Sequence, residues 1–555
     1  LPSTPTPLPL FLLALLTPTP TPFVASPTPT PASAPGTPAP SAAALNLGGG
    51  LTLTVDPAQP LTGRPISFSL QGLPGWARLK VTFLDPASLA VAWTDEHGTF
   101  LVAQASQAVK SATLYADGQG RVSWARLNAL DPEGLWTVKV LVDDQEFRGT
   151  YILTPLQVQT TAVSDLGVSF RRYSGSASEL YASGGVPLAV TLELSGMLSP
   201  LTDRLKPWLS LTSAQIPNVY VFSNKDLFKT AVTAAGATVT GLEAGVYLPF
   251  GQHRGLFVIV DEFNSETTGV LIHEYVHLLV EELAPRASVP AWLNEGLATY
   301  LDIHVRADFG ASLAAQRERY RRADAARKAL ATNALLPLSR LVSQRDWNAE
   351  TDRERASLQY AEAYMAVRYL LERFGNQAAA LIIGEMAKGA SFEAAFQRVT
   401  GVSLSSFEQD WRSWLGQWQD NLREGVRSYV TQVDAIMEEV AKLDSDRGAF
   451  IQASGAATFS QRVAAQTQFL ERAESLESRA LALSPPAPAR VFHSDLAAFL
   501  LVQKRWLQRE LDASRQGSNA IINEANAMIP EVSGRQGRAV DALWGIKYNW
   551  QVGAG

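Results

Sequence analysis

Two histidines and a glutamate stand at a spacing that favours a bound metal ion. His273 and His277 are four residues apart (277 − 273), and Glu274 lies beside the first of them. On an α-helix, residues four apart share one face, with Cβ atoms about 6 Å apart, so both imidazoles can bind one Zn²⁺ ion. Glu274 could then hold a metal-bound water. The pattern His-Glu-x-x-His therefore indicates a zinc-dependent hydrolase.

The helix that must carry these side chains is predicted to be buried. Apolar residues flank the motif on both sides, at 270–272 and 278–280. A helix that is apolar all round lies inside a protein, where histidines and carboxylates are costly unless they are paired or bound to metal. The alternative is a chance match of residues that only pack. The chain has 6 histidines in 555 residues, which makes such a match rare.

A third ligand is expected on a second helix. Glu295 follows His277 by 18 residues (295 − 277), far enough for a turn and a returning helix. It lies in the segment Trp-Leu-Asn-Glu-Gly-Leu-Ala-Thr-Tyr, residues 292–300. With His-Glu-x-x-His, this segment resembles the gluzincin metallopeptidases, especially their peptidase-MA-like bacterial members and the aminopeptidase N branch. The resemblance implies an α+β, thermolysin-like catalytic domain over residues 156–420, with a mixed sheet at 156–262 and a helical part at 263–420.

The resemblance suggests roles for two further residues. Asp302, seven residues beyond Glu295 (302 − 295), matches a carboxylate that supports a metal-binding histidine in the aminopeptidase branch. A solvated carboxylate at a helix end is the alternative. Tyr360, 65 residues after Glu295 (360 − 295), is expected to donate a hydrogen bond to the developing oxyanion. Tyr364 lies one turn further on the same face, and either tyrosine could instead belong to the core.

The substrate-binding strand is less well defined by the sequence. Residues 244–248 and 255–260 read as apolar strands, and the resemblance implies that one of them edges the cleft and pairs with substrate backbone. His253 and Arg254 lie between these strands, where they either contact substrate or form a solvated turn. The chain lacks the Gly-x-Met-Glu-Asn stretch of the aminopeptidase branch, so endopeptidase and exopeptidase action both stay open. Arginines 317–327 are expected to form a solvated helix face.

The composition limits the partners and the metal chemistry. A chain of 555 residues is expected to fold as two to four domains. Its net charge is −6 and its pI about 5.7, and no run of Lys or Arg is present, so nucleic acid is not an expected partner. Because the chain has no cysteine, disulfides and Cys-bound zinc are excluded.

Residues 1–50 bear on localisation. Leu8 to Leu16 form a short apolar run like the core of an export signal, too short to span a bilayer. A Thr/Pro-rich segment then extends to Ser41 and is typical of an extended linker. We expect an exported or cell-surface protein, tethered to the membrane or cell wall through this segment. A disordered tail without function is the alternative.

The remaining regions are predicted from periodicity. Residues 51–155 alternate apolar and polar positions between turn signals, which favours a β-sandwich, and the run Gly-Leu-Trp-Thr-Val-Lys-Val resembles immunoglobulin-like modules. Residues 421–555 contain heptad-like spacings, including Val426, Val430 and Val433, and are expected to form a helical hairpin or bundle.

The sequence thus predicts a multidomain exported zinc peptidase acting on peptide or protein substrates. One Zn²⁺ ion would be held by His273, His277 and Glu295, and Glu274 would take a proton from the metal-bound water. Two alternatives stay open. One is a non-catalytic surface-binding protein on an inactive peptidase fold, and the other is a gluzincin hydrolase of a non-peptide bond.

Overall fold

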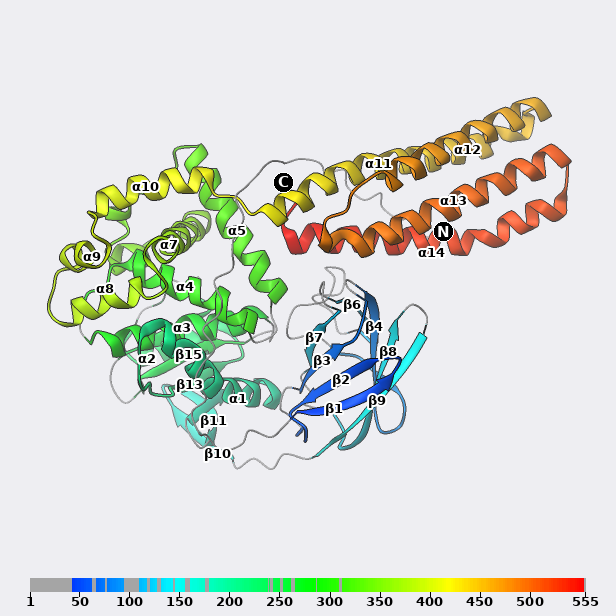
Figure 1. The fold of residues 1–555 in the computed structure, drawn as a ribbon. Helices are drawn as coiled ribbons and strands as arrows, with labels where there is room; N and C mark the ends of the chain where they lie inside the picture. The colour runs from blue at the N-terminus through cyan, green and yellow to red at the C-terminus, as the bar shows by residue number, and fades with distance from the viewer. Residues whose placement is uncertain are drawn as a thin grey trace.

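Three regions with different secondary structure follow one another along the chain (Figure 1). The computed structural model describes residues 42–553 except 62–65, 75–76, 94–108, 117–119, 127–130, 143–144, 155–159, 175–178, 238, 240–242, 250–252, 261–264, 286 and 309–311. The predicted apolar run and the Thr/Pro-rich segment lie outside the described residues. The β-rich N-terminal region and the helical C-terminal region are confirmed.

Two antiparallel sheets form the N-terminal region. One has the strand order β1-β2-β3-β7, and the other has the order β5-β4-β8-β9 with β6 also paired to β4. Alternate side chains along the strands point inward, and they meet in one core around Phe68, Trp124 and Trp136. The strands are β1 (Ala43–Gly48), β2 (Leu51–Asp56), β3 (Ile66–Gln71), β4 (Arg78–Leu84), β5 (Ala90–Val91), β6 (Ala112–Tyr115), β7 (Val122–Arg126), β8 (Gly134–Val142) and β9 (Gln145–Leu153).

A mixed sheet with the order β10-β11-β12-β13-β15-β14 follows. The pairs β12–β13 and β13–β15 are parallel and the others antiparallel. Its apolar side chains fall into two core clusters, one shared with α2 and the other with α1 and α3. These elements are β10 (Thr160–Asp165), β11 (Val168–Ser174), β12 (Glu179–Ser183), α1 (Leu188–Leu205), β13 (Asn218–Phe222), α2 (Lys225–Ala234), β14 (Gly245–Leu248) and β15 (Gly255–Ile259).

A set of helices packs against this sheet and continues the same core. The predicted metal-binding helix is α3 (Ser265–Leu283), and the returning helix with Glu295 is α4 (Ala291–Asp308). Helix α4 crosses α7 closely at Gly296, where a Cβ atom would lie 2.5 Å from the carbonyl oxygen of Ala363. The other helices are α5 (Ser312–Ala331), α6 (Gln344–Asn348), α7 (Arg353–Phe374), α8 (Ala378–Ala387), α9 (Phe392–Thr400) and α10 (Leu404–Gln417).

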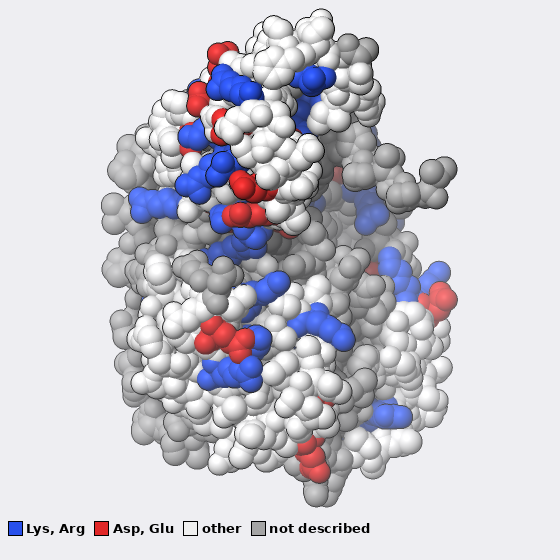
Figure 2. All heavy atoms as spheres, turned by 90° about the vertical axis from the view of Figure 1, so that its right-hand side faces the viewer, with Lys and Arg blue, Asp and Glu red and all other residues white. Residues whose placement is uncertain are grey.

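Four long helices, here called the C-terminal arm, project away from the rest of the molecule (Figure 1). They are α11 (Asn421–Ala453), α12 (Phe459–Leu481), α13 (Arg490–Gln516) and α14 (Asn519–Trp550). The predicted seam residues Val426, Val430 and Val433 are buried between them. Ion pairs such as Arg447–Glu510 and Arg472–Asp446 join neighbouring helices. Figure 2 shows the corresponding mixture of positive and negative side chains over the helical end of the molecule.

The basic helix α5 connects the arm to the other helices. Its arginines are predicted to face solvent, and this prediction is wrong for three of them. Arg322 donates to the carbonyl oxygen of Ser357 on α7 at 3.3 Å. Arg317 donates a hydrogen bond to Asn549 Oδ1 at 2.9 Å, and Arg319 pairs with Asp420 at 2.8 Å. A solvated face therefore cannot be read from charge alone, because long cationic side chains also serve at helix contacts.

No helix among the described residues is both long enough and apolar enough to cross a membrane.

A buried carboxyl group on α7 should make the stability of the protein depend on pH. Glu362 is fully buried and accepts a hydrogen bond from the Leu336 N–H, at 3.1 Å from each carboxyl oxygen. Burial raises the pKa of Glu362 from 4.5 to about 8. Between these two values the folded protein binds more protons than the unfolded chain, so stability falls as pH rises from 4.5 toward 8.

We predict that Glu362→Gln removes this dependence while keeping an acceptor for the Leu336 N–H. The variant should unfold at a higher temperature than the wild type at pH 8, and the gain should shrink at pH 5. The substitution removes a change in the free energy of unfolding of at most about 1.4 kcal/mol per pH unit. Thermal unfolding at several pH values measures this, with Glu474→Gln on the exposed surface of α12 as the control. An increase in unfolding temperature that is the same at pH 5 and pH 8 would contradict the prediction.

Candidate metal centre

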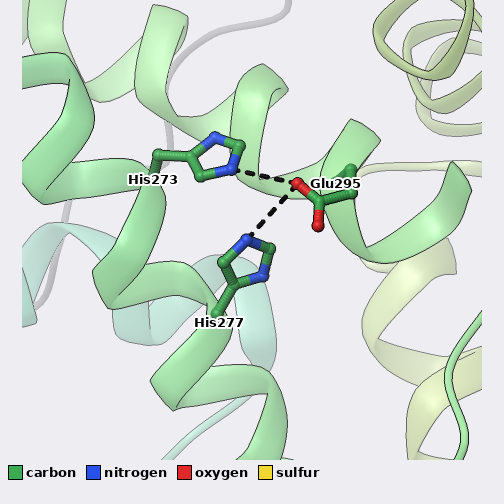
Figure 3. Close-up of side chains that lie close together, drawn as sticks. All are labelled: His273, His277 and Glu295. Carbon is green, nitrogen blue, oxygen red and sulfur yellow. Dashed lines mark hydrogen bonds and ion pairs between the residues drawn. The ribbon is translucent and has the colours of Figure 1, made fainter. Parts of the chain in front are cut away.

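Helices α3 and α4 bring the three predicted metal ligands together (Figure 3). Glu295 Oε2 lies 3.1 Å from His273 Nε2 and 3.5 Å from His277 Nε2. One ligand atom from each of the three residues lies within 4.8 Å of the other two. The spacing of four residues on α3 sets the distance between the imidazoles, and the return of α4 places the carboxylate opposite both rings.

The geometry of this group fits a metal ion. Zinc binds imidazole nitrogen and carboxylate oxygen at about 2.0–2.2 Å, so two ligand atoms of a tetrahedral site lie about 3.3 Å apart. The distances of 3.1 and 3.5 Å from Glu295 Oε2 to the two ring nitrogens are close to that separation. Two neutral imidazoles and one carboxylate also form a donor set that zinc accepts. The group could therefore hold a divalent metal ion.

The electrostatics of the group are those of a buried ion pair. Burial acts to raise the pKa of the Glu295 carboxyl, but the charges and hydrogen bonds of His277 and His273 outweigh it and hold that pKa well below its usual range. Burial acts to lower the pKa of His277, and the Glu295 carboxylate overcomes this and raises it to about 9. A metal ion would replace the protons that otherwise balance this carboxylate.

Two neighbouring amides orient these groups, and sequence reasoning missed both. Asn294 Oδ1 lies 3.1 Å from His277 Nδ1. Because an amide oxygen only accepts, the proton belongs on Nδ1, which leaves Nε2 free to bind a metal. Gln344 Nε2 donates to Glu295 Oε1 at 2.7 Å. Asn294 could have been found as the residue that precedes Glu295, whereas nothing in the sequence marks Gln344.

Glu274 lies beside the metal-binding group and contacts the edge of the mixed sheet. Its Oε2 atom accepts a hydrogen bond from the Tyr247 backbone N–H at 2.8 Å. Burial raises the pKa of Glu274, against the opposing effect of His273 and His277. The strand approaches the helix closely at Gly245, where a Cβ atom would lie 2.6 Å from Val270 Cγ1. A side chain at that position would push β14 away from α3.

The hydrogen bond to Glu274 also shows which way the strand faces. Among the described residues β14 is the last strand of the sheet, so one of the two predicted strands is an edge strand. In antiparallel pairing, successive residues direct their N–H and C=O groups alternately to the partner strand and away from it. Since the Tyr247 N–H reaches Glu274, the main-chain groups of Tyr247 and Gly245 face away from β15. The free edge of β14 thus opens on the metal-binding side.

The structure separates the two candidate tyrosines. The Tyr360 ring lies 5.9 Å from the His273 ring, whereas Tyr364 is fully buried in the core near Tyr300. Burial raises the pKa of Tyr360 well above its ordinary value of 10, and the nearby Glu295 charge adds to this. Its phenol therefore stays protonated at neutral pH.

Other predicted residues have partners outside the metal-binding group. The Asp302 carboxylate accepts a hydrogen bond from Arg306 Nε at 2.9 Å, and within the described part of the chain no hydrogen bond joins it to His273 or His277. His253 lies 3.4 Å from Asp165. Arg254 donates to the Tyr247 hydroxyl at 3.0 Å, so it supports the edge strand.

Residues 256–417 match the family model of the peptidase MA superfamily. The matched segment contains the whole metal-binding group and suggests a metallo-hydrolase. A curated relative is the uncharacterized protein YhcO of Bacillus subtilis (strain 168), 26% identical over 148 residues. That match covers 26% of this chain and 39% of the relative's length.

Solved structures with some likeness include two of yeast LTA4 hydrolase. The complex with bestatin is 11% identical, covers 90% of this chain and 93% of its own, and gives a TM-score of 0.29. The native enzyme is 10% identical and gives a TM-score of 0.32, and the match covers 91% of this chain and 92% of the enzyme's chain.

We predict that the Asn294 amide tunes metal affinity. Asn294→Ala should weaken zinc binding by about 10–100-fold, because the His277 ring loses the acceptor that fixes its orientation. His277→Ala should lose the metal altogether. Titration against a competing chelator measures both, with Asn376→Ala, an exposed site before α8, as the control. Wild-type zinc affinity in Asn294→Ala would show that the amide has no such role.

Proposed function

We propose that this protein is a zinc-dependent peptidase whose catalytic region is a thermolysin-like gluzincin domain. The observation that carries the proposal is the convergence of His273, His277 and Glu295, with the Glu274 carboxylate beside them. The match of residues 256–417 to the peptidase MA superfamily supports the same conclusion. One Zn²⁺ ion held by the three ligands would supply a Lewis acid that polarises the scissile carbonyl.

Glu274 is the general base in this proposal. It lies next to the metal-binding group in a buried environment, and burial raises its pKa, which strengthens it as a proton acceptor. Its carboxylate takes a proton from the attacking water and passes it to the leaving amine. The Tyr247 N–H holds one carboxylate oxygen at 2.8 Å and so orients the other for this transfer.

Tyr360 and the edge strand supply the remaining functions. The Tyr360 hydroxyl donates a hydrogen bond to the oxygen that gains negative charge in the transition state. An extended peptide adds to the free edge of β14 through the carbonyl oxygen of Tyr247 and the main-chain groups of Gly245, because the Tyr247 N–H is already bonded to Glu274. This mode of binding favours a peptide substrate over a non-peptide bond, because only a peptide offers a matching row of donors and acceptors.

The proposed site of action is outside the cytoplasm. The apolar run at residues 8–16 and the Thr/Pro-rich segment after it support an exported or surface-tethered protein. A non-catalytic surface-binding protein is less consistent with the residues, because the base and all three ligands are retained together.

We predict that Glu274→Gln keeps the metal and loses turnover. Replacing the base should lower kcat by about 10²–10⁴-fold, while zinc content by elemental analysis stays at the wild-type level. Cleavage of a peptide library, followed by mass spectrometry with and without chelator, measures the activity. Glu393→Gln, an exposed site on α9, is the matched control.

Two outcomes would overturn these assignments. Wild-type cleavage by Glu274→Gln would remove Glu274 from the mechanism. A zinc-loaded wild-type protein that cleaves no peptide in the library would instead favour the binding protein or the non-peptide hydrolase.

A further inference from the structure

Arg322 on α5 contacts the helix that carries Tyr360 in two ways. Its guanidinium carbon lies 5.5 Å from the centre of the Tyr360 ring, within the range of a cation–π contact. Its Nη1 atom donates to the carbonyl oxygen of Ser357 at 3.3 Å, three residues before Tyr360 (360 − 357). Glu318, one turn earlier on α5, holds the Nε atom of Arg322 at 2.6 Å. The guanidinium is therefore fixed from both sides.

The Tyr360 ring has two other aromatic neighbours. Trp347 meets it edge to face at 5.1 Å with an interplanar angle of 88°. The His273 ring lies at 5.9 Å with an angle of 61°. Together with Arg322, these groups restrict the rotation of the phenol next to the metal-binding group.

Helix α5 is in turn held by the C-terminal arm, beside which it lies in Figure 1. Arg423, at the start of α11, is 1% exposed and donates to Asp324 on α5 and to the carbonyl oxygens of Trp550 and Gln551. The Tyr320 ring stacks on Trp550 at 6.1 Å, and its hydroxyl donates to Asp420 at 3.1 Å. Both ends of the arm thus meet on α5.

We propose that Arg322 is a positioning residue for Tyr360, and that the C-terminal arm keeps Arg322 in place by holding α5. The inference rests on the proposed function, because it assigns Tyr360 a role in the transition state. A phenol that is less well placed stabilises the oxyanion less. Because this interaction is made only in the transition state, kcat should fall while KM stays unchanged.

The first test compares two neighbouring arginines. Arg322→Met should lower kcat by about tenfold, less than the 10²–10³-fold for losing an oxyanion donor, with KM within about twofold. Arg322→Lys should restore part of the loss, because it keeps the cation. Arg321 is the matched control, since it also pairs with Glu318, at 2.6 Å, and approaches Ser357 Oγ at 3.5 Å. Arg321→Met should leave both constants near wild type.

A second readout does not depend on activity. The protein has 14 tyrosines, and each gives a ¹⁹F resonance when fluorotyrosine replaces tyrosine. The resonance that disappears in Tyr360→Phe belongs to Tyr360. Arg322→Met should shift that resonance, and Arg321→Met should not. An unchanged resonance together with an unchanged kcat in Arg322→Met would overturn the proposal while leaving the peptidase assignment standing. A wild type without peptidase activity would overturn the peptidase assignment, and the resonance would still test the contact.

The contribution of the arm is tested at its junction with α5. Asp324→Asn keeps the size of the side chain but removes the charge that faces Arg423. Asp324→Asn should shift the Tyr360 resonance in the same direction as Arg322→Met does, and it should also lower kcat. Both effects should be smaller than in Arg322→Met. Asp541→Asn, exposed on α14, is the control. A folded Asp324→Asn variant with the wild-type resonance and kcat would refute the role of the arm.

Discussion

The convergence of two imidazoles and one carboxylate is the constraint on which the rest of the structure depends. A buried carboxylate is costly without compensating charge, and here His273 and His277 provide it at 3.1 and 3.5 Å. The arrangement needs two successive helices, α3 and α4, to turn back on each other so that their side chains meet at one point. It also needs partners for the outer atoms of the ligands, which Asn294 and Gln344 supply. The metal-binding group is therefore a property of packing as much as of the motif.

Close backbone approaches make that packing possible. Helix α4 can cross α7 only because Gly296 has no side chain to meet the Ala363 carbonyl. The same crossing brings the Tyr360 ring to the His273 ring. At the sheet edge, Gly245 lets β14 reach α3, so that the Tyr247 N–H can bind Glu274. Two glycines in different elements thus set the distances between the candidate metal ligands, Glu274 and Tyr360.

The C-terminal arm belongs to the same system of contacts. The segment that matches the peptidase MA superfamily ends at residue 417 and so excludes the arm. Arg322, Tyr320 and Asp324 lie within that segment, but Arg423 and Trp550, which hold α5 from the other side, lie beyond it. The arm also reaches the β-rich region, where Arg78 lies 3.7 Å from Asp495. Helix α5, which lies within the matched segment, is therefore held by a part of the chain that the family match does not cover.

The local features of this protein follow from short stretches of its sequence. The four-residue spacing of His273 and His277 places both on one helix face, and period-two and heptad patterns predict the β-rich region and much of the arm. The packing of the elements makes β14 the sheet edge and places Tyr360 rather than Tyr364 beside the site. It also brings Gln344 to Glu295, 49 positions away (344 − 295). Packing also places Arg317 in contact with the arm, and it adds α14 to the arm as the fourth helix. The physical reason is that periodicity depends on neighbours a few residues apart, whereas contacts between distant residues exist only once the elements have packed.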